Sequence, residues 1–365
     1  MLRASARDFL SRECPSPTVR ALIETPDAHD PALWATLAGL GWTGLGIPEA
    51  YGGAGGFGDL AVVEEEIGRA LLPGPFLSTM GLLVPALLEA GSESQRRDVL
   101  SRVAAGEAIG TVALAEPSGR WDAGGIQLGA VRVDGGWRLD GRKDLVPDAG
   151  VATHIVVPAR TGARDGGITL FLVEGRPDGL TLTAHDGLDL TRRWYQAAFD
   201  GVRLDDGAVL GRVGDGWEPM RRALEWGTTA LCAEMIGGGQ RVLDLSVEYV
   251  KTRQQFGRPI GAYQAVSHRV ADMLQQTESA RSATYYATWA IDADAPDRSL
   301  AVSAAKAYTS DAYLAAAGSA IQVHGGIGFT WEHDLHLYYR RAKASEQLLG
   351  DATYHRELVA QALDL

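Results

Sequence analysis

Two separate segments of the chain carry residue types suited to binding a phosphate-bearing ligand. The first begins at Arg253 and includes Phe256, and the second contains Gln322 and the pair Gly325-Gly326. A guanidinium pairs strongly with phosphate oxygens, and a glycine turn lets backbone N–H groups approach them closely. Taken singly, Arg253 could form a surface ion pair, and the two glycines could end a helix. Their occurrence together favours a pyrophosphate-binding surface.

These segments also match the two signatures of a known enzyme family in type and order. The segment at Arg253 resembles the R-x-x-F-G signature of the acyl-CoA dehydrogenases, and the segment at Gln322 resembles their Q-x-x-G-G signature. A further match at Gly46 to Glu49 extends the resemblance over nearly the whole chain. The resemblance implies FAD as the cofactor, bound where two subunits meet. It also implies that one subunit reaches across this interface with six residues: Arg253, Phe256, Gln264, Gln322, Gly325 and Gly326.

The loop that forms the other side of the flavin site in this family is different here. The family sequence is T-E-P-x-A-G-S-D, whereas residues 115–122 read A-E-P-S-G-R-W-D. Ala115 stands where the family has a threonine that hydrogen-bonds the isoalloxazine edge. Arg120 and Trp121 stand where the family has a small Gly-Ser pair. We therefore expect two large side chains to fill the space of the cofactor and the substrate.

A second flavin-contacting segment of the family, W-I-T, is also changed. The corresponding positions are Leu145, Val146 and Pro147, and a proline offers neither a hydroxyl nor a backbone N–H. An alternative interpretation is that other residues hold the flavin in a slightly different way. We favour loss of this half of the site. Other residues can replace polar contacts to the flavin, but they cannot restore the space that large side chains occupy.

The resemblance further implies a catalytic carboxylate, which is missing at both positions that the family uses. Removal of an α-proton as a β-hydride moves to flavin requires a carboxylate of raised pKa beside the α-carbon. In most members it is a glutamate before a Gly-Thr pair, and here that position is Leu349, followed by Gly350 and Asp351. The alternative family position falls on Gly227, and the supporting arginine beside it is Thr228.

Three acidic residues lie near these positions in the sequence. On a helix, Glu225 is rotated by about 200° from position 227, and Glu234 is displaced by about 10 Å along the axis. Asp351 is the remaining candidate, although it is one methylene shorter than glutamate and is offset by two positions. We therefore predict no catalytic residue in this chain.

The succession of hydrophobic patterns predicts three domains of an α+β, acyl-CoA dehydrogenase-like fold. Residues 1–107 read as helical, with Asp59 expected to cap one helix. Residues 108–213 contain short alternating runs and the hairpin turn 134–136, which predict a β-barrel or sandwich domain. Residues 214–365 predict a C-terminal four-helix bundle with helices at 217–250, 258–292, 297–325 and 333–363.

Composition narrows the class of protein. The chain has 365 residues, of which 46% are hydrophobic and 22% charged, as in ordinary globular proteins. Its net charge of -12 argues against nucleic acid or an anionic membrane as a partner. Two cysteines, no signal-peptide pattern and no long apolar run predict a cytoplasmic protein without a membrane span. His333 and His336 lack the spacing and the cysteine partners of a metal site, so we predict none.

The combined pattern predicts a subunit of an FAD-dependent acyl-CoA dehydrogenase that completes the flavin site of a catalytic partner subunit. The chain resembles the non-catalytic subunits of heteromeric α2β2 acyl-CoA dehydrogenases of actinobacteria, which act on steroid side-chain CoA thioesters. A heterotetramer and an acyl-CoA substrate of that class are therefore implied. Two alternatives stay open: a homo-oligomeric flavoprotein with an atypical base such as Asp351, and a flavin-free structural or binding partner.

Overall fold

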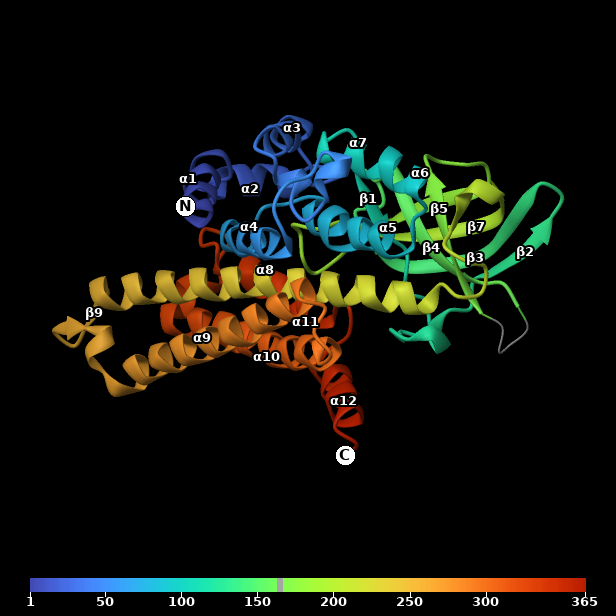
Figure 1. The fold of residues 1–365 in the computed structure, drawn as a ribbon. Coiled ribbons are helices and arrows are strands. Elements are labelled where there is room, and N and C mark those ends of the chain that lie inside the picture. The colour runs from blue at the N-terminus through green and yellow to red at the C-terminus, as the bar shows by residue number, and fades with distance from the viewer. Residues whose placement is uncertain (163–166) are drawn as a thin grey trace.

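The computed structural model describes residues 1–162 and 167–365 and contains helices, then a sheet, then a second set of helices (Figure 1). In the first helical region, Asp59 stabilises the start of a helix from inside its first turn rather than from the N-cap. Its Oδ2 accepts the Gly56 N–H at 3.1 Å. The helices of this region are α1 (Leu2–Glu13), α2 (Ser16–Ile23), α3 (Pro31–Gly39), α4 (Phe57–Ala70), α5 (Val84–Ala90), α6 (Glu93–Gln95) and α7 (Ser101–Ala104).

The described part of the middle region forms one eight-stranded sheet in the order β6-β7-β3-β2-β4-β5-β8, with β1 paired to β4. The predicted hairpin is confirmed, because Val133 pairs with Gly136 and Gly135 has the positive φ of 78° that its turn requires. The strands are β1 (Gly110–Val112), β2 (Gly129–Val133), β3 (Gly136–Pro147), β4 (His154–Arg160), β5 (Ile168–Glu174), β6 (Leu180–His185), β7 (Trp194–Asp205) and β8 (Val209–Leu210).

The C-terminal region is helical as predicted, but it has five helices among the described residues rather than four. The predicted fourth helix, 333–363, is broken because Leu349 and Gly350 have positive φ values of 61° and 99°, which a right-handed helix does not contain. The second helix starts at Gln264 rather than at residue 258. The helices are α8 (Trp217–Thr252), α9 (Gln264–Asp292), α10 (Arg298–His324), α11 (Leu335–Gln347) and α12 (Ala352–Ala362).

A short β-hairpin explains the later start of the second helix. Strands β9 (Gln254–Gln255) and β10 (Arg258–Pro259) pair in antiparallel fashion between α8 and α9. Phe256 and Gly257 form the turn, with φ values of 50° and 79°. The hairpin projects from the end of the helical region, at the far left of Figure 1.

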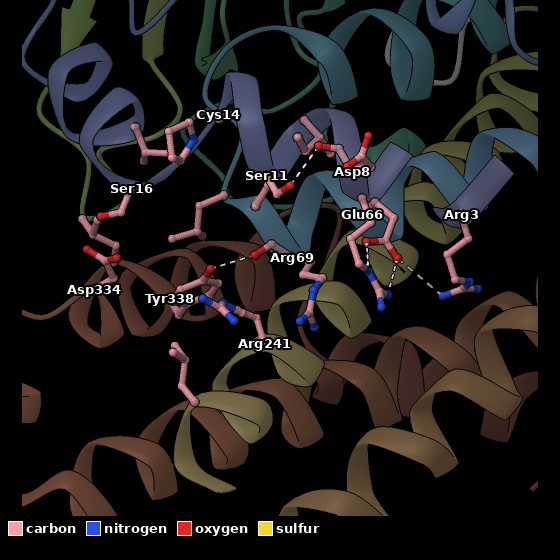
Figure 2. Close-up of a pocket in the computed structure, with 18 of the residues that line it drawn as sticks. Arg3, Asp8, Ser11, Cys14, Ser16, Glu66, Arg69, Arg241, Asp334 and Tyr338 are labelled. Carbon is pink, nitrogen blue, oxygen red and sulfur yellow. Dashed lines mark hydrogen bonds and ion pairs between the residues drawn. The ribbon is translucent and has the colours of Figure 1, made fainter. Parts of the chain in front are cut away.

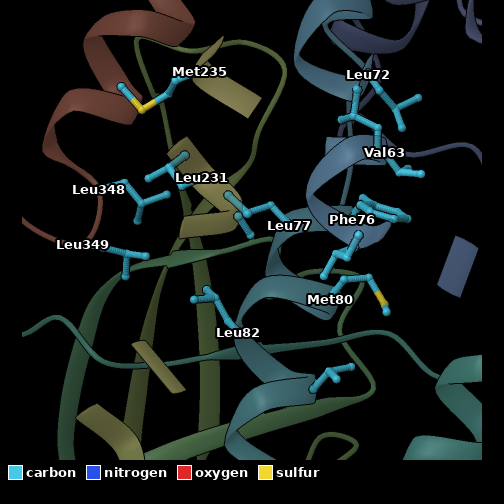
Figure 3. Close-up of a cluster of buried hydrophobic side chains, with 14 of the residues drawn as sticks. Val63, Leu72, Phe76, Leu77, Met80, Leu82, Leu231, Met235, Leu348 and Leu349 are labelled. Atoms are coloured by element: carbon cyan, nitrogen blue, oxygen red, sulfur yellow. The ribbon is translucent and has the colours of Figure 1, made fainter. Parts of the chain in front are cut away.

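The break between α11 and α12 is anchored in the main hydrophobic core (Figure 3). Leu348 and Leu349, which come from this break, lie with Leu231 and Met235 of α8 and with Leu82 from the first helical region. All three segments are far apart in the sequence. Among the described residues, no helix is both long and apolar enough to cross a membrane.

Candidate functional site

The residues predicted to bind a flavin across an interface lie on the surface, at one end of the C-terminal region. Arg253 follows α8 directly, Phe256 lies at the turn of the β9-β10 hairpin and Gln264 begins α9. Gln322 lies in the last turn of α10, and the two glycines follow that helix. All six side chains or glycine backbones are exposed: Arg253, Phe256, Gln264, Gln322, Gly325 and Gly326.

The same end of the molecule exposes large apolar side chains that a soluble monomer normally covers. Phe256 is 92% exposed and Phe329 77%, and Ile327 and Trp331 are about half exposed. The hairpin that presents Phe256 is held by contacts with Tyr263, whose ring lies under the Arg258 guanidinium at 4.1 Å and meets the Phe256 ring edge-on. Exposed aromatic side chains grouped with an arginine and open glycines are typical of a binding surface.

The positions that would form this chain's own side of a flavin site surround a very small cavity. Its volume is about 10 Å³, roughly what one water molecule needs. The residues predicted to have changed line it: Ala115, Trp121, Leu145, Pro147 and Leu349. A bound cofactor requires a cavity of hundreds of Å³. The cavity that these residues enclose is therefore too small to hold a flavin by itself.

Only one of the two large side chains predicted to fill this space does so. Trp121 lines the small cavity, and its carbonyl oxygen lies 3.5 Å from the donating hydroxyl of Tyr354 in α12. Arg120, in contrast, points outward and donates two hydrogen bonds to the Asp122 carboxylate, at 3.0 and 2.7 Å. The prediction for Arg120 is wrong because an exposed guanidinium keeps its hydration and finds a partner two residues away.

A buried ion pair holds the altered loop in place. Lys143 of β3 donates to the Glu116 carboxylate at 2.7 Å, and both side chains are buried. Glu116 also accepts the backbone N–H groups of Gln127 and Leu128, at 2.8 and 3.1 Å. Burial lowers the Lys143 pKa to about 8. This pair was not predicted from the sequence, and the signal that could have revealed it is the presence of two charged residues, Glu116 and Lys143, beside apolar runs.

The turn that carries Leu349 is equally well fixed. Lys306 of α10 is fully buried, and its ammonium donates to the carbonyl of Gly350 at 2.8 Å and to carbonyls in the last turn of α11. His355 Nε2 donates to the Leu349 carbonyl at 2.9 Å. Desolvation lowers the Lys306 pKa to about 8. The backbone is therefore held by specific contacts, while the side chain at the family's base position is an apolar leucine.

The second family position for a base has no room for any side chain. A Cβ atom added to Gly227 of α8 would lie 2.5 Å from the Gly81 carbonyl oxygen and 2.8 Å from a methyl group of Leu82. Contacts this short do not occur in folded proteins without a shift of the backbone. A carboxylate at this position is therefore excluded by packing as well as by sequence.

The three nearby acidic residues have structural partners. Asp351 caps α12 by accepting the Tyr354 N–H at 2.8 Å. Glu225 pairs with Arg298 at 2.7 Å. Glu234 is buried and pairs with Arg192. The small cavity beside Leu349 has none of these carboxylates in its lining, whereas Glu225 lines the neighbouring cavity of about 270 Å³ together with Leu349.

Two larger cavities are present, and one of them adjoins the predicted site. One of about 1030 Å³ lies between α1, α4, α8 and α11, where Figure 2 shows Arg3, Glu66, Arg69 and Arg241 around it. None of the predicted site residues lines this cavity. Another of about 270 Å³ lies between α8, α10 and α12, and its lining includes both Trp121 and Leu349.

No cluster of metal-ligating side chains was found within residues 1–162 and 167–365. The two histidines that invite a metal interpretation have other contacts. His333 Nδ1 accepts the Leu335 N–H at 3.2 Å, and the His336 ring packs against Trp331.

Comparison with known proteins identifies the family to which the chain belongs. Family models for the N-terminal, middle and C-terminal domains of acyl-CoA dehydrogenases match residues 1–107, 111–201 and 214–363. The chain belongs to the acyl-CoA dehydrogenase family. Membership implies FAD as the cofactor and oxidoreductase chemistry on acyl-CoA, and it confirms the predicted fold class.

Particular members of the acyl-CoA dehydrogenase family are similar over almost the full chain. The acyl-CoA dehydrogenase IpdE2 of Mycolicibacterium smegmatis is 33% identical, over 96% of this chain and 94% of its own length. The structure of a variant of the steroid ACAD Tcur3481-Tcur3483 is 31% identical with a TM-score of 0.89, covering 100% of this chain and 96% of that one. The ChsE4-ChsE5 complex of Mycobacterium tuberculosis is 28% identical with a TM-score of 0.91, with coverages of 100% and 96%.

Proposed function

We propose that this acyl-CoA dehydrogenase family member is a non-catalytic subunit that completes the flavin site of a catalytic partner subunit. The observation that carries the proposal is the cavity of about 10 Å³ where a catalytic member would hold its own flavin and substrate. It is supported by the leucine at position 349 and by the lack of space for a side chain at Gly227.

In the proposed complex, this chain binds the flavin from across the interface. Arg253 neutralises the pyrophosphate, and the exposed backbone of the Gly325-Gly326 turn, which has no side chains, approaches the cofactor closely. Phe256 covers an apolar part of it, and the amides of Gln264 and Gln322 supply hydrogen bonds. FAD held in this way would supply the acceptor for a hydride from the β-carbon of the acyl-CoA. The base that removes the α-proton comes from the partner.

The proposed assembly is a heterotetramer, and the proposed substrate is a steroid side-chain CoA thioester. Two relatives support this part of the proposal: the ChsE4-ChsE5 complex and the steroid ACAD Tcur3481-Tcur3483. The large side chains exposed beside the six flavin-binding residues, Phe329 and Trp331 among them, supply the apolar area that such an interface needs.

The test is the amount of FAD bound per polypeptide, measured by absorbance and quantitative gel. The chain is produced alone and together with a family member that has the catalytic glutamate and an intact T-E-P-x-A-G-S-D loop. We expect one FAD per mixed pair and almost none on the lone chain. One FAD on every lone chain would contradict the proposal and favour a homo-oligomeric enzyme with Asp351 as its base. No FAD on the mixed pair would favour a flavin-free binding partner.

A further inference from the structure

Tyr249, in the last turns of α8, contacts the two segments that carry five of the six proposed flavin-binding residues, all except Gln264. We call residues 253–259 the first arm and residues 322–326 the second arm. The Tyr249 carbonyl accepts the N–H of Arg253 at 2.8 Å, which ends α8 and starts the first arm. The Tyr249 hydroxyl lies 3.4 Å from the carbonyl oxygen of His324, inside the second arm. Tyr249 therefore contacts the first arm through its backbone carbonyl and the second arm through its side-chain hydroxyl.

The rings of Tyr249 and His324 are also stacked. Their centroids are 4.3 Å apart and their planes differ by 22°. His324 is 4% exposed, and its Nδ1–H donates to the Ala320 carbonyl at 2.8 Å, which fixes the orientation of the ring. A third ring, His333, meets His324 edge-on at 4.9 Å. The three rings run from α8, past the end of α10, to the segment that leads into α11.

The second arm begins in the last turn of α10 and continues into the exposed glycine turn. A Cβ added at Gly325 or Gly326 would meet no atom within 4 Å, so both glycines face open space. Gly325 has φ of 65° and ψ of -141°, a conformation open to glycine alone, and its N–H bonds back to the carbonyls of Ile321 and Gln322. The residue next to it, His324, is the buried one. The stacked ring of His324 therefore links this end of α10, and with it the glycine turn, to α8.

We propose that Tyr249 and His324 are positioning residues that hold the two arms at a fixed separation, so that both engage one flavin of the partner subunit. This inference rests on the proposed function. Arms held in place before binding lose less entropy when they engage a ligand, and an aromatic stack adds stability beyond its buried area. Neither residue is expected to touch the reacting atoms.

The first test uses the lone chain and amide hydrogen exchange. In Tyr249→Leu, we expect exchange of the Arg253 and Gly325 amides to rise together, roughly three- to tenfold, as loss of one aromatic stack allows. Tyr249→Phe keeps the ring and should stay within about twofold of the wild type. Tyr286→Leu is the control, because Tyr286 is a half-exposed aromatic residue on α9.

Faster exchange of the Arg253 amide without faster exchange of the Gly325 amide would overturn the coupling of the two arms. If Tyr249→Leu does not fold, His324→Leu removes the same aromatic stack from the other side. The same measurement then applies, which is hydrogen exchange of the Arg253 and Gly325 amides.

The second test uses the mixed complex and the rate of FAD release. We expect faster release with Tyr249→Leu and with His324→Leu, in proportion to the exchange effects, and near-normal release with Tyr249→Phe. Unchanged release with altered exchange would overturn the positioning role. If the mixed complex binds no FAD at all, the proposed function fails, and the coupling of the arms is still decided by the exchange experiment.

Discussion

The two halves of the family's flavin site have opposite environments in this chain. The half formed by the two arms is exposed, with Phe256 at 92% and with open space around both glycines of the second arm. The other half, around Trp121 and Leu349, is closed to a cavity of about 10 Å³. One half therefore exposes groups suited to a ligand, whereas the other half encloses only this small cavity beside a second one of about 270 Å³.

The supporting structure of the closed half is intact. The Glu116–Lys143 ion pair holds the altered loop, and Lys306 and His355 hold the turn that carries Leu349. The differences from the family are in the side chains that line the cavity, while the backbone around them has specific anchors.

The largest effect is expected from breaking the frame of the closed half. Lys143→Met leaves the Glu116 carboxylate buried without its cation, which should cost about 3–5 kcal/mol of unfolding free energy. Urea unfolding measures the loss. The control is Arg102→Met, which breaks the exposed Arg102–Glu174 pair and should cost about 1 kcal/mol or less. Equal small losses in both variants would show that the buried pair does not hold the loop.

A smaller effect is expected from reopening the closed half. Trp121→Ala removes a partly buried ring between the small cavity and its 270 Å³ neighbour and should cost about 2–3 kcal/mol. We expect no FAD on this variant when it is produced alone, because Ala115 and Pro147 still lack the family's hydrogen-bonding groups. Trp331→Ala, on the exposed half, is the control and should leave stability nearly unchanged. Bound FAD on lone Trp121→Ala would show that volume alone had abolished the site.

The exposed half is tested by removing its cation. Arg253→Ala should weaken FAD binding by the mixed complex roughly ten- to hundredfold, as expected for a lost charge-assisted hydrogen bond. The unfolding of the lone chain should be unaffected, because Arg253 is exposed. Arg12→Ala, at a distant exposed ion pair, is the matched control. FAD affinity that is the same in both variants would remove Arg253 from the site.

A further prediction concerns the pH dependence of the turn at Leu349, where the effect per pH unit is small. The Lys306 pKa is about 8 in the folded chain, below its ordinary value of 10.5, so the unfolded chain binds more protons between these pH values. Stability should therefore rise with pH across this window, with a Lys306 contribution of at most about 1.4 kcal/mol per pH unit. Urea unfolding between pH 8 and 10.5 should show a shallower rise for Lys306→Met than for the wild type. Identical slopes would mean that Lys306 is not desolvated.

Much of the architecture could be predicted from local patterns. The order of helices, strands and helices, the β2-β3 hairpin at Gly135 and the long α8 all follow from hydrophobic periodicity and turn residues. The break at Leu349 could not, because Leu348 and Leu349 have ordinary helical propensity. Their conformation depends on contacts with Lys306 and His355, which lie in other helices.

The candidate site divides in the same way. Sequence alone determined which residue types are present: an arginine, glutamines and glycines in the two arms, and no carboxylate at positions 227 and 349. Only the tertiary structure decided that Trp121 fills the cavity while Arg120 turns outward, and that Tyr249 stacks on His324. The physical reason is that volume, stacking and burial depend on residues brought together from distant parts of the chain, whereas side-chain chemistry belongs to each residue by itself.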